Sequence, residues 1–298
     1  MEFISKFDWK TFFCEVYKKA DDTDLLNRAA QVGFFFSFAF FPLLLFLVTL
    51  LGIVLESTDS LKAELYSYLA RIMPSSAYEL VYKTLDEIVE TSSGGKLTLG
   101  LLVTLWSASA GVDSIRSSLN AVYEHREERS WWHTKLQSLA LTLLFIVLIG
   151  VALSAVTFGW QLVQWIFISM SLEVTSPWIL VSIQWAALLL VMIFATGVVY
   201  SWLPCFDKTE WVWISPGAVV AILLWIAFTA GFRLYLQYFN TYNKAYGSLG
   251  AVIILMLWMY LTGTALLIGG AINSVLTEMT QEKEKNRDSS EIEYQSSE

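Results

Sequence analysis

Six long runs without a charged side chain divide this sequence. They cover residues 29–55, 97–112, 136–172, 174–206, 211–232 and 245–277. An α-helix needs about 20 residues to cross the roughly 30 Å hydrocarbon core of a bilayer. Five runs exceed that length. The run 97–112 is shorter, but it continues helically into Asp113, Arg116 and Asn120, whose polar ends can reach the headgroups. The runs therefore predict an all-α integral membrane protein with six transmembrane helices.

Proline positions help to set the limits of these helices. Ser176-Pro177 and Ser215-Pro216 match the N-cap and first position of a helix, and Pro204 ends the span before it. Pro42 lies inside the first span, where we expect a kink. We expect one transmembrane domain over 1–278, with spans at about 29–55, 97–120, 136–160, 177–203, 215–239 and 247–276.

Three further segments carry polar or amphipathic patterns. Residues 57–96 are charged and divided by Pro74, which predicts an outer helical hairpin between the first two spans. Residues 8–20 place aromatic side chains on one face behind Asp8, which predicts an N-terminal interfacial helix on the inner leaflet. The polar, unpatterned segment 279–298 predicts a disordered cytoplasmic tail.

Composition and charge agree with this class and exclude others. Hydrophobic residues make up 56% of the 298 positions and charged residues 15%, too apolar a balance for ordinary soluble domains. The net charge of −8, without clustered Lys and Arg, opposes nucleic-acid binding. Thirteen Lys and Arg residues fall on one set of connecting segments and five on the other, with Arg233 inside a span. The positive-inside rule then places both termini in the cytoplasm.

A polar stripe on the second span is the first candidate functional feature. Ser109, Asp113, Arg116 and Asn120 follow spacings of 4, 3 and 4, so they share one helix face, and Asp113 can pair with Arg116. Charged residues in a membrane bundle normally face its interior or water. Two interpretations stay open: a wetted cytoplasmic face, or a polar cavity that forms part of a substrate path.

Two residues on other spans extend the candidate substrate path. Arg233 lies near the outer end of the fifth span, where it either snorkels to the headgroups or binds an anionic headgroup or substrate. Asn273 in the sixth span is expected to hydrogen-bond across helices.

The sixth span also carries pairs of small residues four positions apart. Such pairs let neighbouring helices approach closely, so we expect packing roles for all six. The pairs are Gly247 with Ala251, Ala265 with Gly269, and Gly270 with Ser274.

The sequence offers little for catalysis. Its two histidines, His125 and His133, share one short polar segment with several glutamates, and a solvated loop explains them as well as a metal or acid–base site does. Phosphate-binding glycine loops, a nucleophile elbow and a His-Glu-x-x-His motif are absent from the sequence. We therefore expect no enzyme activity, no metal and no cofactor.

Several stretches together resemble one bacterial family, the YihY/virulence factor BrkB membrane proteins, formerly mislabelled ribonuclease BN. They cover most of the chain from about residue 9 to 276. The matching stretches are RAAQVGFFFSFAFFPLLLFLV, LWSASAGVDSIRSSLNAVYE, WLPCFDKTEWVWISPGAVVAILLW and GFRLYLQYFNTYNKAYGSLGAVIILMLWMYLTGTALLIGGAIN.

The resemblance implies an inner-membrane protein with about six spans, linked to the handling of envelope lipids or lipopolysaccharide and often regarded as a candidate transporter. The sequence departs from the family at Ala271, where many members carry an acidic residue. We expect a protein that moves or accommodates an amphipathic, lipid-like solute with an anionic group, with membrane lipids as partners. The alternative is a membrane scaffold that acts through the outer hairpin.

Overall fold

A computed structural model describes residues 8–55, 67, 94–169, 177–206, 215–238 and 248–296. Within these ranges the chain forms helices and no strand, which confirms the all-α class. The expected hairpin falls almost wholly outside the described residues. The helices are α2 (Trp9–Asp22), α3 (Leu25–Leu55), α6 (Gly94–Val122), α7 (Trp131–Ser169), α8 (Pro177–Trp202), α9 (Pro216–Tyr238) and α11 (Ser248–Ser296).

Four helical stretches in the described residues are long and apolar enough to cross a membrane. They are Trp131–Ala152 in α7, Trp185–Trp202 in α8, Pro216–Tyr238 in α9 and Val252–Gln281 in α11. Two more helices, α3 with 31 residues and α6 with 29, contain the first two uncharged runs. The chain is therefore a multi-pass helical membrane protein.

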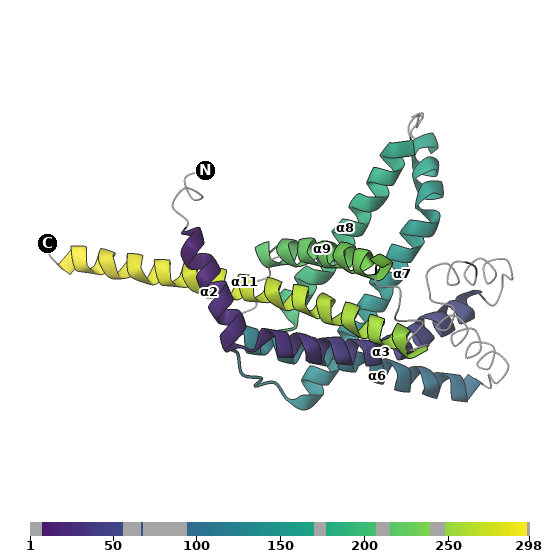
Figure 1. Ribbon diagram of the computed structural model, residues 1–298, viewed down its shortest axis with the longest axis horizontal. Coiled ribbons are helices and arrows are strands. Elements are labelled where there is room, and N and C mark those ends of the chain that lie inside the picture. The colour runs from purple at the N-terminus through teal and green to yellow at the C-terminus, as the bar shows by residue number, and fades with distance from the viewer. Residues whose placement is uncertain are drawn as a thin grey trace.

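The helices pack into a bundle from which one hairpin projects (Figure 1). The helices α3 and α6 run side by side, and α11 packs against both α3 and α9. The hairpin of α7 and α8 leads away from them (Figure 1). A buried apolar cluster joins α3, the end of α6, the end of α8 and the middle of α11; its members include Val32, Leu119, Leu203 and Leu267. The hairpin is thus anchored at one end of the bundle.

Small residues allow α11 to approach its neighbours. A Cβ atom on Gly269 would collide with the Tyr200 hydroxyl and the Gly217 carbonyl, and one on Gly270 would lie 2.7 Å from Leu119 Cδ2. Ala265 and Ser274 are buried. Ala251 lies in α11, and Gly247 lies outside the described residues.

The short helix α2 crosses α11 near the point where the apolar part of α11 ends (Figure 1). Asp8 caps α2, because its carboxylate accepts from Lys10 N at 3.1 Å and Thr11 N at 3.3 Å. Phe12 is buried against Ile272 and Val275 of α11. The N-terminal helix is therefore held across the bundle by an apolar contact.

The C-terminal segment differs from the sequence expectation. A disordered tail was expected over 279–298, but α11 continues as one helix to Ser296. The apolar part of α11 already provides the costly helix nucleus, so each added residue needs only propagation. The Glu and Lys residues that begin the tail are good helix formers.

Candidate functional site

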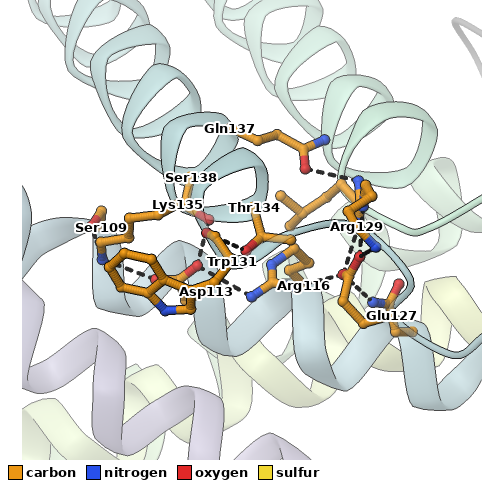
Figure 2. A network of polar contacts seen from close by, with 12 residues as sticks. Ser109, Asp113, Arg116, Glu127, Arg129, Trp131, Thr134, Lys135, Gln137 and Ser138 are labelled. Atoms are coloured by element: carbon orange, nitrogen blue, oxygen red, sulfur yellow. Dashed lines mark hydrogen bonds and ion pairs between the residues drawn. The ribbon is translucent and has the colours of Figure 1, made fainter.

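A network of polar side chains joins α6, the start of α7 and the loop 123–130 (Figure 2). Ser109, Asp113 and Arg116 project from one face of α6, as their spacing requires. Lys135 and Ser138 project toward them from α7.

The inner part of the network is built around Asp113. Lys135 Nζ lies 3.0 Å from Asp113 Oδ2 and donates to Ser109 Oγ at 2.6 Å. Ser138 Oγ donates to Asp113 Oδ1 at 2.6 Å. The Lys135 side chain is only 9% exposed. A buried ammonium requires an anionic partner and further acceptors, and Asp113 and Ser109 supply both.

Arg116 links Asp113 to the loop. Its Nη2 lies 3.4 Å from Asp113 Oδ1, the pair expected from the sequence, but Nη1 makes a shorter contact of 2.6 Å with Glu127 Oε2. The Nε atom of Arg116 is buried and has no hydrogen-bond partner within the described part of the chain. The guanidinium therefore keeps an unused donor inside the network.

Glu127 and Arg129 form the outer part of the network. Arg129 Nε donates to Glu127 Oε1 at 2.7 Å, and Nη2 donates to Glu127 Oε2 at 2.9 Å, a bidentate pair. Burial disfavours the charged form of Glu127, but the hydrogen bonds from Arg129 and Arg116 outweigh it and lower the pKa of this carboxyl to about 2. Glu127 is therefore a carboxylate throughout the physiological pH range.

Two further contacts attach the end of α8 to this network. Arg129 also donates to the Leu203 carbonyl at 3.0 Å and to Gln137 Oε1 at 2.8 Å. Asn120 donates to Glu127 Oε2 at 2.9 Å and accepts from the Cys205 backbone N–H at 2.9 Å. The polar stripe of α6 thus contacts α7, the loop and the end of α8.

The other two candidates on the predicted path lie elsewhere. Asn273 Oδ1 accepts from Gly217 N at 2.9 Å, and its Nδ2 donates to Ser215 Oγ at 2.9 Å, so this side chain caps the start of α9. Arg233 lies exposed on α9, outside the network.

A separate ionic contact surrounds Lys19 of α2. Its Nζ lies 2.7 Å from Glu124 in the loop and 2.7 Å from Glu278 of α11, and the side chain is 8% exposed. Burial opposes the charge on Lys19, but its two carboxylate partners outweigh burial and raise its pKa. Because Glu124 and Glu127 share the loop 123–130, this loop is fixed from both sides.

The site also contains four residues that the sequence does not predict as its members: Lys135, Ser138, Glu127 and Arg129. For α7 the sequence does contain a pattern that indicates a polar helix face, because Lys135, Ser138 and Thr142 follow spacings of 3 and 4.

His125 and His133 are exposed, and the described residues contain no group of three His, Cys, Asp or Glu that could hold a metal ion.

Comparisons with known proteins place this chain in a family. The family model described as "Virulence factor BrkB" matches residues 16–293. A Bacillus subtilis (strain 168) protein named as ribonuclease-like, YfkH, is 31% identical over 268 residues, covering 89% of this chain and 95% of that protein. No solved structure matches. The match over most of the chain shows that this protein belongs to the virulence factor BrkB family of membrane proteins.

Proposed function

We propose that this protein crosses the bacterial inner membrane six times, with both termini in the cytoplasm, and moves an amphipathic solute that carries an anionic group. The four apolar spans in α7, α8, α9 and α11, together with the long helices α3 and α6, support the six-span count. The excess of Lys and Arg on one set of connecting segments supports the orientation.

The observation that carries this proposal is the charged network between α6 and α7. Charged groups inside a transmembrane bundle are costly and commonly mark the path of a substrate or ion. The network contains three cations, Lys135, Arg116 and Arg129, and two carboxylates, Asp113 and Glu127. The excess positive charge and the unused Arg116 Nε donor favour an anionic ligand.

The network also suggests how movement would be controlled. Its contacts hold α6, α7 and the end of α8 together. An anionic group that competes with Asp113 or Glu127 for their cations would weaken these contacts and favour a conformation in which the helices separate. A ligand shifts such an equilibrium only by its differential affinity for the two states, and exchange of ion-pair partners supplies that difference.

Reconstituted vesicles test the transport proposal. Purified protein is placed in vesicles that contain fluorescent phosphatidylglycerol or phosphatidylcholine, and a membrane-impermeant quencher reports transfer between leaflets. We expect faster transfer of the anionic lipid and loss of this transfer in Lys135→Gln. Ser182→Ala is the matched control, because Ser182 is exposed on α8 and bonds only to the Trp178 carbonyl of its own helix among its described hydrogen bonds. Transfer of neither lipid would contradict transport of this class of solute and favour a scaffold.

A further inference from the structure

A row of exposed aromatic side chains lies on the surface where α6 meets α7. The rings of Trp106 and Trp131 are 6.0 Å apart between centroids, and those of Trp131 and Trp132 are 4.7 Å apart. Leu102 on α6 and Leu136 on α7 are also exposed. We call these five residues, Leu102, Trp106, Trp131, Trp132 and Leu136, the lateral patch.

The chemistry of the lateral patch fits the boundary between lipid tails and headgroups. Tryptophan combines a large apolar ring with one N–H donor and is enriched at this depth of membrane proteins. Trp131 and Trp132 begin α7 directly after the polar loop 123–130, whereas Leu102 lies deeper along α6. An acyl chain would therefore lie along the leucines and a headgroup beside the tryptophans.

A buried cation lies directly behind this patch. Lys135 Nζ is 4.5 Å from the centre of the Trp106 ring, and that tryptophan is 44% exposed. An ammonium has three N–H donors, and Lys135 uses two of them on Ser109 Oγ and Asp113 Oδ2. The π face of Trp106 occupies the remaining side as a cation–π contact. The Trp106 ring, which belongs to the lateral patch, thus lies between the ammonium of the network and the protein surface.

We propose that the lateral patch seats a membrane phospholipid with an anionic headgroup, and that Trp106 is a movable cover over Lys135. When the indole turns aside, the third N–H of Lys135 donates to a phosphate oxygen of the lipid. Lys135 then loses a cation–π contact and gains a charge-assisted hydrogen bond to phosphate. The new hydrogen bond is the stronger interaction, so it compensates for the lost contact. This inference names the ligand class of the network and rests on the proposed function for the claim that the lipid then moves.

Charge favours an anionic lipid over a zwitterionic one at this position. The network behind the patch has one more cation than carboxylates, as described above, so a phosphate with no compensating charge neutralises it. A phosphatidylcholine headgroup brings its own quaternary ammonium close to Lys135, where like charges repel.

The test measures lipid-dependent melting of the purified full-length protein in detergent. Phosphatidylglycerol, phosphatidylcholine or inorganic phosphate is added to the wild type and to three variants. Lys135→Gln removes the charge but keeps hydrogen-bonding groups, and Trp106→Phe keeps a ring over Lys135. Trp178→Leu is the matched control, because Trp178 is a highly exposed tryptophan on α8, away from the patch.

We expect phosphatidylglycerol to raise the melting temperature of the wild type, Trp106→Phe and Trp178→Leu by several degrees more than phosphatidylcholine does. In Lys135→Gln the two lipids should act equally. If that variant does not fold, the double variant Lys135→Gln/Asp113→Asn, which keeps a neutral hydrogen-bonded pair, replaces it. The lipid seat is overturned if both lipids raise the melting temperature of the wild type equally. It is also overturned if inorganic phosphate alone raises that temperature as much as phosphatidylglycerol does.

The two proposals fail in different ways. If melting distinguishes phosphatidylglycerol from phosphatidylcholine through Lys135, but neither lipid is transferred between leaflets, the lipid seat stands and the transport proposal fails. If anionic lipid is transferred but the melting temperature does not depend on lipid charge, the transport proposal stands and the lipid seat fails.

Discussion

At the scale of single residues, Asp113 is the side chain on which the inner network depends. It accepts from Lys135 at 3.0 Å and Ser138 at 2.6 Å, whereas Arg116 lies at 3.4 Å. Removing one member of a buried ion pair leaves an uncompensated charge and typically costs about 3–5 kcal/mol. The cost here should lie at or below the lower end of that range, because Asp113 is partly exposed.

A double-mutant cycle on detergent melting therefore should give a larger coupling energy for Asp113 with Lys135 than for Asp113 with Arg116. Asp113→Ala and Lys135→Ala should each be strongly destabilising, and their combination should be milder than the sum. Strictly additive effects for the Lys135 pair would place both groups in solvent and remove the basis of the candidate site.

Glu127 gives the network a defined pH dependence. Its pKa of about 2 in the folded protein lies below the ordinary value of 4.5, so the folded state favours the ionised form. The stabilisation it contributes is complete above about pH 4.5 and is lost as the pH falls toward 2. Glu127→Gln should therefore melt at a lower temperature than wild type at pH 7, with the difference shrinking in acid. A difference that is constant from pH 7 to pH 3 would contradict the ion pairs with Arg116 and Arg129.

At the scale of helices, two glycines show where helices are in close contact and where a helix surface is open. Gly269 of α11 faces the Gly217 carbonyl and the Tyr200 hydroxyl. Beyond the local helix backbone, no atom of the described residues lies within 4 Å of a Cβ placed on Gly231 of α9. Gly269→Ala should cost about 1–3 kcal/mol or more through overpacking. Gly231→Ala should be neutral or slightly stabilising, because alanine favours the helix by roughly 0.5–1 kcal/mol. Thermal unfolding of the two variants makes the comparison, and equal melting temperatures would show that α9 and α11 do not approach closely.

The adjacent lysines of α2 provide a second matched pair. Lys19 is buried between Glu124 and Glu278, while Lys18 is exposed. Because both glutamates are more than half exposed, the contact should be worth about 1 kcal/mol. Lys19→Met should therefore raise the amide hydrogen-exchange rate of α2 about five-fold, and Lys18→Met should leave it unchanged. Equal exchange in the two variants would show that the apolar contact of Phe12 alone holds α2.

Periodicity explains which of these elements the sequence predicts and which it does not. Uncharged runs and proline caps locate α7, α8, α9 and α11, because hydrophobicity and capping are local properties. The 4, 3, 4 spacing likewise puts Ser109, Asp113, Arg116 and Asn120 on one face. Partner choice depends on how α7 crosses α6, which no local pattern encodes. The sequence therefore shows that Lys135 and Glu127 are charged residues of a polar segment. It does not show that Lys135 pairs with Asp113 or that Glu127 pairs with Arg116.

At the scale of the whole molecule, the ion pairs among the described residues gather at one end of the bundle. The Glu127 network and the Lys19 contact share the loop 123–130, and Arg129 of this loop also contacts Leu203 at the end of α8. Asn273 caps the start of α9 at the same end. The helix α2 crosses α11 there, before α11 continues as a polar helix (Figure 1). The thirteen Lys and Arg residues proposed to lie on the inner side include those of α2, the loop and the tail, so we expect this end to face the cytoplasm.

Cysteine labelling in intact cells tests this orientation. Cys14 is exposed on α2, so it is a natural reporter for the proposed inner side once Cys205 is replaced. A membrane-impermeant maleimide should not label Cys14 until the cells are permeabilised, and Ser289→Cys in a cysteine-free chain should behave in the same way. Ser76→Cys, in the predicted outer hairpin, should label in intact cells. Short connecting segments with a strong bias of Lys and Arg set orientation, so the expected pattern follows from charge alone. If Cys14 and Ser289→Cys are labelled in intact cells and Ser76→Cys is protected, the orientation is the reverse of the proposed one. The network would then lie at the outer leaflet.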